Sequence, residues 1–111
     1  MGIIGGINTN IRFSDSNWER FKTKNKDTTW RTTKRKDGIY ERVKGSYYKP
    51  IKTGEKLEIK YQKSKPFGAL DESDARHDGF DTLQEFIEEL ISLNPKLEAS
   101  TILYCHAGKI I

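Results

Sequence analysis

The segment from Asp78 to Pro95 constrains the fold most, because it contains a helix whose two ends are both marked in the sequence. Thr82, followed three residues later by Glu85, predicts a capping box at the helix start. Pro95 predicts the end, because its ring also disfavours helical geometry at the preceding residue. The apolar residues between them recur at helical spacing and share one stripe: Leu83, Phe86, Ile87, Leu90 and Ile91. We therefore expect an amphipathic helix that packs one face on a core.

An acidic turn precedes this helix. Gly79 lets the chain turn sharply directly after Asp78, and a short loop ties both residues to the helix start. A carboxylate held in that position can bind a ligand or take part in catalysis. Asp-Gly is also typical of a plain turn, so the residues alone leave both interpretations open.

Composition limits the class of protein. A chain of 111 residues, of which 34% are hydrophobic, fits one domain with a modest core. No apolar run approaches the length that crosses a membrane, and the first residues lack the pattern of a signal peptide. Cys105, the one cysteine, cannot form an internal disulfide and suits a reducing compartment. We expect a single, soluble, cytoplasmic domain over residues 1–111.

Charge is distributed unevenly along the chain. Residues 22–65 carry fifteen Lys or Arg against five Asp or Glu, whereas residues 66–98 carry nine acids against two bases. Aromatic residues are interleaved with the basic ones, a combination that favours phosphate attraction and base stacking. RNA or a nucleotide is therefore the expected partner, and an ordinary solvated Lys-rich surface is the alternative. The residues expected to contact the partner are Trp30, Lys34, Arg35, Lys36, Tyr47 and Tyr48.

Local patterns predict several strands and two further helices. The expected strands cover residues 8–13, 28–33, 39–43, 55–61 and 100–106, and the expected helices run from 14–16 to about 25 and over 71–76. Asp37-Gly38 predicts a hairpin that joins the second and third strands. Residues 64–68, which include Pro66, predict a break. The fold class is α+β, and we expect a small mixed β-barrel.

Three residue types suggest a nucleophile and its base. Alternation in the strand places Thr29 and Arg31 on one face, with Lys26 at the turn that enters the strand. A lysine near an arginine, or removed from water, shifts toward its neutral form and can take a proton from a threonine hydroxyl. Asp78 is the carboxylate that can orient this lysine. A surface lysine and an ordinary strand threonine remain the alternative.

Two motifs resemble a known family. Lys26, Thr29 and Arg31 follow an N-terminal helix with the spacing Lys-x-x-Thr-x-Arg, and a Gly-containing turn leads into a strand at residues 53–57. The stretch Asp74-Ala75-Arg76-His77-Asp78-Gly79-Phe80-Asp81-Thr82-Leu83-Gln84-Glu85-Phe86 is the more specific motif. Together they resemble the ASCH domain, a member of the PUA-like β-barrel superfamily, over about residues 11–104.

The resemblance implies a barrel of five or six strands with a cleft for RNA or a nucleobase. Small members of the family are amidohydrolases that remove the acyl group from acetylated cytidine, and other relatives resemble nucleases that act on RNA. It implies Lys26 as the base, Thr29 as the nucleophile and Asp78 as the third catalytic member. Arg31 is implied to contact the substrate or a phosphate.

The chain departs from the family pattern in three places. Asp78 stands where the family has the longer Glu, the expected hairpin over residues 32–50 is long and basic, and residues 62–68 are short and polar where the family has a strand. An open sheet edge would invite strand pairing, so we expect a monomer or a weak homodimer. These departures favour RNA or nucleotide binding over the alternative, an amidohydrolase or ribonuclease.

The remaining candidates for metal binding do not form a site by spacing. His77, His106 and Cys105 fall short of a tetrahedral set, so we expect no zinc and no cofactor. Cys105 alternates with polar neighbours on a strand and is expected to be a small buried hydrophobe.

Overall fold

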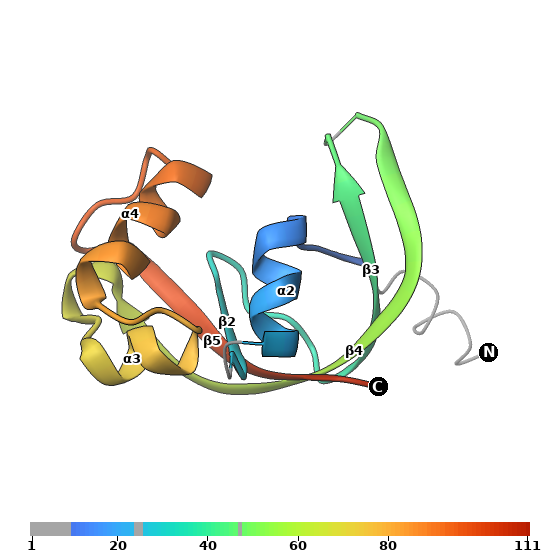
Figure 1. The fold of residues 1–111 in the computed structure, drawn as a ribbon. Coiled ribbons are helices and arrows are strands. Elements are labelled where there is room, and N and C mark those ends of the chain that lie inside the picture. The colour runs from blue at the N-terminus through green and yellow to red at the C-terminus, as the bar shows by residue number, and fades with distance from the viewer. Residues whose placement is uncertain (1–9, 24–25, 47) are drawn as a thin grey trace.

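A single mixed sheet of five strands organises the protein in a computed structural model, which describes residues 10–23, 26–46 and 48–111 (Figure 1). The strands, in their order across the sheet, are β1 (Asn10–Arg12), β3 (Gly38–Gly45), β4 (Pro50–Pro66), β5 (Ile102–Ile110) and β2 (Thr28–Arg31). The helices are α2 (Asp15–Thr23), α3 (Glu72–His77) and α4 (Leu83–Leu93), with one 3-10 turn at Phe67–Ala69. The expected α+β class is confirmed.

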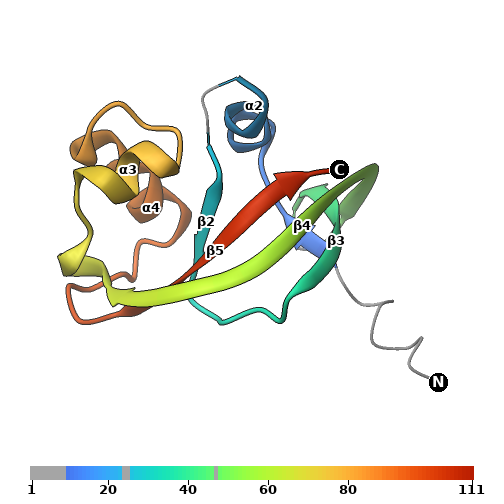
Figure 2. The same ribbon diagram turned by 90° about the horizontal axis from the view of Figure 1, so that it is seen from below.

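The sheet is strongly curved, and its two edge strands approach each other through side chains. β1 runs parallel to β3, and every other neighbouring pair is antiparallel. Register shifts interrupt both ladders of β4, where bulges increase the bend. Figures 1 and 2 show the sheet curling around α2, with α3 and α4 grouped beyond β2. Within the described ranges β1 and β2 do not pair through their backbones, so the sheet is open there.

Two hydrophobic clusters fill the curved sheet. The first lies around α2 and consists of Ile11, Phe13, Trp18, Tyr40, Leu57 and Ile59. The second lies around α3 and α4 and consists of Trp30, Leu70, Ala75, Phe80, Phe86, Leu90, Leu103 and Cys105. Cys105 is buried as the sequence predicts, and so is Trp18.

The predicted helix ends are confirmed. The Thr82 hydroxyl accepts a hydrogen bond from the Glu85 amide at 3.2 Å, and α4 ends before Asn94. Phe86 and Leu90 are buried, whereas Ile91 at the end of the stripe is 43% exposed. α3 begins at a complete capping box formed by Asp71 and Asp74.

The predicted hairpin between residues 28–33 and 39–43 is wrong. β2 pairs with β5, where Thr29 lies opposite His106, and β3 pairs with β1 and β4, where Tyr40 lies opposite Leu57. The two strands serve different clusters, because Trp30 packs with α4 and Tyr40 packs with α2. Residues 32–37 are therefore a connection across the curved sheet, and the basic residues within it do not form a hairpin tip.

The predicted break at residues 64–68 begins too early. β4 continues through Lys63 and Ser64 to Pro66, which lies opposite Ile102 of β5. Exposed polar side chains suit this part of the strand because one face is open to water, and the proline occupies the last strand position. The polar segment over residues 62–66 is thus a strand, and the chain leaves the sheet only at the 3-10 turn.

Across the described residues, no helix has the length and apolar character needed to cross a membrane.

Candidate functional site

A cavity of about 430 Å³ opens beside β2 and contains the three predicted catalytic residues. Lys26, Thr29 and Asp78 all line it, together with Arg31. Its apolar wall consists of Phe13, Trp30, Leu90, Leu93, Leu97 and Leu103. Its further polar lining consists of Arg12, Ser14, Asn17, Thr32, Glu89 and Asn94. A volume of this size lies within the roughly 300–1,000 Å³ typical of small-molecule sites.

Backbone contacts between the start of β2 and the end of α3 bring Lys26 and Asp78 together. The Asp27 amide donates to the His77 carbonyl at 2.8 Å, which fixes the two segments side by side. Asp78 caps α3, and Gly79 follows with a φ of 87°, a left-handed conformation that lets the chain turn toward α4. Lys26 Nζ then lies 2.8 Å from Asp78 Oδ2, with the two side chains only 3% and 8% exposed.

Burial sets the charge state of this lysine. Loss of water lowers the pKa of Lys26, and the positive charges of Arg31 and Arg20 act in the same direction. The carboxylate of Asp78 opposes them, because it raises the pKa of Lys26 through its charge and hydrogen bond. The pair therefore holds an amine that gives up its proton more readily than a solvated lysine does.

Arg31 positions the hydroxyl of Thr29. Arg31 Nε donates to Thr29 Oγ1 at 3.0 Å, and another guanidinium nitrogen donates to the Arg12 carbonyl of β1 at 2.8 Å. Burial and the neighbouring Arg35 lower the pKa of Arg31 to about 10, so its guanidinium is still charged at neutral pH. Among the described residues, Lys26 and Thr29 both line the cavity but no hydrogen bond joins them. Catalytic groups often form such a hydrogen bond only when the substrate is bound.

Most predicted RNA-contacting residues lie outside this cavity. Trp30 does line the cavity, but it is 7% exposed and belongs to the core, so it offers no free surface on which the bases of an RNA could stack. Lys34 and Lys36 are exposed on the β2–β3 connection, with Lys34 Nζ 4.3 Å from the Tyr61 ring centre. Tyr48, near the β3–β4 turn, is 90% exposed. Tyr47 lies outside the described residues.

Arg35 has a structural contact that the sequence does not suggest. Its guanidinium donates to the Asn10 carbonyl of β1 at 3.1 Å and lies over the Tyr40 ring. With Arg31, it spans the gap between the two edge strands. Its role as a phosphate contact stays a prediction.

Sequence reasoning also missed three groups of residues. The hydroxyl that donates to Asp78 Oδ1, at 3.1 Å, is that of Thr28 and not that of Thr29. The two threonines differ because adjacent residues of a strand face opposite sides of the sheet. Arg42 is buried and bonded to Asp15, Glu55 and the Phe13 carbonyl. Asn17 and Glu89, from α2 and α4, meet at the cavity wall. No local motif marks any of these pairings.

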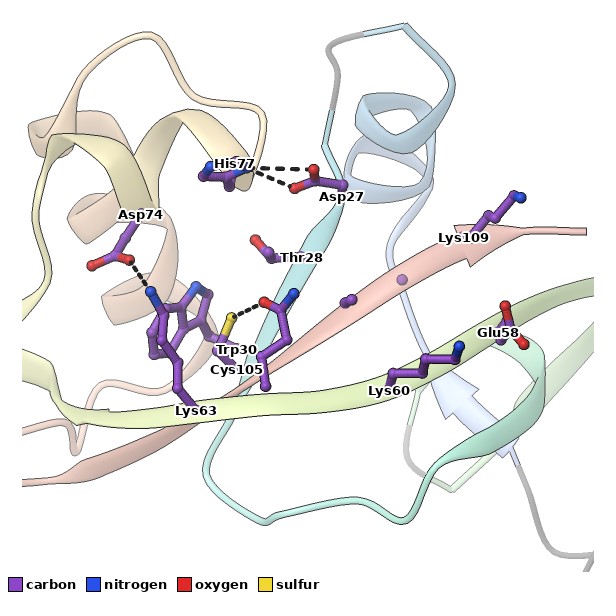
Figure 3. Close-up of a pocket in the computed structure, with 13 residues that line it drawn as sticks. Asp27, Thr28, Trp30, Glu58, Lys60, Lys63, Asp74, His77, Cys105 and Lys109 are labelled. Carbon is purple, nitrogen blue, oxygen red and sulfur yellow. Dashed lines mark hydrogen bonds and ion pairs between the residues drawn. The ribbon is translucent and has the colours of Figure 1, made fainter.

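A second cavity, of about 370 Å³, lies on the Thr28 side of β2 (Figure 3). Figure 3 shows two ion pairs among its lining residues: His77 with Asp27 at 3.1 Å, and Lys63 with Asp74 at 3.5 Å. Cys105 lies at its base, and burial raises the pKa of this thiol to about 12. These two ion pairs and the protonated thiol make it the weaker candidate for chemistry.

The chain is thus an α+β protein with a buried Lys–Asp pair at the wall of a small cavity. No protein-family model matches it, and no curated protein or solved structure is significantly similar to it.

Proposed function

We propose that the chain is an ASCH-like domain that hydrolyses the amide of an acylated, cytidine-type nucleoside. The observation that supports this most is the convergence of Lys26, Thr29 and Asp78 on one cavity, although Asp78 is far from the other two in the sequence. Small cavity size and an apolar wall favour a nucleoside over a polymer.

The proposed reaction begins with attack by Thr29. Its Oγ forms a bond to the acyl carbon, and its proton passes to the neutral amine of Lys26. The bond between the acyl carbon and the exocyclic nitrogen then breaks, and that nitrogen takes the proton from Lys26. Water hydrolyses the threonine ester, releasing the carboxylic acid and the free hydroxyl. Asp78 orients Lys26, and Arg31 holds the hydroxyl.

The proposal includes the PUA-like barrel as the finer fold class. Curvature of the five-stranded sheet and the side-chain bridges from Arg31 and Arg35 to β1 support it. In this interpretation the barrel is completed between β1 and β2 by guanidinium groups in place of a backbone ladder.

Release of cytidine from N4-acetylcytidine tests the proposed activity. We expect hydrolysis by the wild-type protein and losses of about 100-fold or more in Thr29→Val and Lys26→Met. Thr33→Val and Lys96→Met, at exposed positions outside the cavity, are the matched controls. Unchanged activity in Thr29→Val would contradict the mechanism, and a folded wild-type protein without activity would contradict the function.

RNA binding is the second candidate, and the exposed Lys34, Lys36 and Tyr48 favour it. Binding through these residues predicts an affinity for single-stranded RNA that falls steeply with salt and weakens in a Lys34/Arg35/Lys36 triple-alanine variant. RNA cleavage that requires Lys26 would instead indicate a ribonuclease. RNA binding that does not change with salt concentration would count against both RNA binding through these residues and a ribonuclease.

A further inference from the structure

A second polar group lines the catalytic cavity apart from the Lys26–Asp78 pair. Asn17 of α2 donates through its side-chain amide to Glu89 Oε2 of α4, at 2.9 Å. Asn17 is 8% exposed, although it is polar. Among the described residues, no hydrogen bond reaches Asn17 Oδ1 or Glu89 Oε1, and no cation pairs with Glu89. The pair therefore offers acceptor oxygens at the wall of a largely apolar cavity.

Such a pair selects ligands by their donors. The carboxylate of Glu89, which is half-buried and lines the cavity with Leu90 and Leu93, favours a ligand that brings hydroxyl or N–H groups. The bond between Asn17 and Glu89 uses one amide hydrogen and fixes the direction of the remaining oxygens. Hydrogen bonds to a fixed, charged acceptor are among the strongest that a site can offer.

The proposed reaction limits which donors remain available. When the acyl carbon lies at Thr29, the exocyclic N–H of the base lies beside the bond that breaks and is held at that end of the cavity. The other donors of an acylated cytidine are the hydroxyls of its sugar. Carboxylates bind ribose hydroxyls in the same way in dinucleotide sites.

We infer that Asn17 and Glu89 form a ribose subsite that accepts hydrogen bonds from the vicinal 2′- and 3′-hydroxyls of the substrate. This inference rests on the proposed function, because the reacting end of the ligand fixes where its sugar lies. It makes the protein selective for ribonucleosides over the free base and over nucleosides without these hydroxyls.

Comparison of two substrates tests the subsite. N4-acetylcytidine and N4-acetyl-2′,3′-dideoxycytidine carry the same scissile amide and differ only in the two hydroxyls. We expect kcat/KM of the wild-type protein to be about 10-fold or more higher for the ribonucleoside. Glu89→Gln, which keeps the shape of the side chain, should lose most of this preference because its kcat/KM for the ribonucleoside falls. Glu88→Gln, one residue earlier on the exposed side of α4, is the control.

The outcomes separate the subsite from the function. Hydrolysis of both substrates with equal kcat/KM would overturn the subsite and leave the function standing. Hydrolysis of neither would overturn the function, and calorimetric binding of cytidine against 2′,3′-dideoxycytidine would then decide the subsite. Tighter binding of cytidine that Glu89→Gln abolishes supports it, and equal or absent binding of the two overturns it.

Discussion

Lys26 Nζ lies 2.8 Å from Asp78 Oδ2, and the second carboxylate oxygen of Asp78 accepts the hydroxyl of Thr28 at 3.1 Å. Asp78 thus has a partner for each oxygen in a place with almost no water. Removing two charges from water costs several kcal/mol per ion, and their attraction offsets this only with good geometry and further hydrogen bonds. Such a pair is weak evidence of a contribution to stability and better evidence of a functional arrangement.

Replacing Lys26 should destabilise the protein strongly. Lys26→Met leaves Asp78 as an uncompensated buried charge, for which we expect a loss of about 3–5 kcal/mol in the free energy of unfolding. A Lys26→Met/Asp78→Leu double variant removes both charges and should recover most of the loss. Urea unfolding at pH 7 measures both, with Lys96→Met as the exposed control. Equal stability of Lys26→Met and the wild type would show that the pair is not buried in solution.

The pH dependence of hydrolysis should report the charge on Lys26. The proposed base must be neutral, so kcat/KM rises as pH increases through the pKa of Lys26. Asp78 raises this pKa, and Asp78→Asn removes the opposing charge while keeping an oxygen for Thr28. The pKa of Lys26 should therefore fall, and the rising limb of the profile should move to lower pH. A shift to higher pH would exclude Lys26 as the base.

Local signals explain why the helices are predictable. The Thr82 cap, the Asp71 cap and Pro95 act within one turn of the chain, and the structure places the helix ends at these positions. The turn at residues 78–79 is local in the same way. Strand positions along the chain follow from alternation, for example Leu57 and Ile59, which are both buried.

Strand pairing depends on distant residues and is not predictable from local signals here. Asp37-Gly38 indicates a turn, but the Asp37 carboxylate accepts the Tyr61 amide at 2.8 Å and does not close a hairpin. The choice between Thr28 and Thr29 as the partner of Asp78 depends on which face of β2 meets α3. Lys26, Thr29 and Asp78 line one cavity, but the catalytic roles that the family resemblance implies for them stay a prediction.

Arg42 should stabilise the fold at neutral pH more than at acidic pH. Its buried guanidinium holds the pKa values of Asp15 and Glu55 below their ordinary values of 3.8 and 4.5. A carboxylate whose pKa is lower in the folded protein than in the unfolded chain stabilises the fold. This stabilisation is complete at a pH above the pKa of the unfolded chain, and it is lost as the pH falls through the pKa of the folded protein. Arg42→Met should thus be less stable than the wild type at pH 7, by less than Lys26→Met, because Asp15 and Glu55 can regain water.

The difference between Arg42→Met and the wild type should shrink below about pH 4, where both carboxylates of the unfolded chain become protonated before those of the folded wild type do. Urea unfolding at pH 7 and pH 3.5 measures it, with the exposed Lys36→Met as the control. A difference that stays constant with pH would assign the role of Arg42 to packing alone.

His106 should make the protein less stable as the pH falls below about 6.5. The ring is fully buried, and its Nε2 accepts the Arg35 amide at 2.9 Å, so the proton of the neutral ring is on Nδ1. Burial lowers the pKa of His106 below the ordinary 6.5, and the charges of Arg31 and Arg35 act in the same direction. Between the folded pKa and 6.5 the unfolded chain binds a proton that the folded chain does not, so stability decreases toward lower pH by at most about 1.4 kcal/mol per pH unit. Below the folded pKa this dependence ends.

The His106→Gln variant isolates this effect. Glutamine offers an oxygen to the Arg35 amide but cannot titrate, so the free energy of unfolding should lose this pH dependence between pH 7.5 and 5.5. His77→Gln retains His106 and serves as the control, since His77 lies on the surface with its ring 3.1 Å from Asp27. Equal pH dependence in His106→Gln and the wild type would show that His106 is not held neutral, because a solvated imidazole gains its proton in both states and leaves stability unchanged.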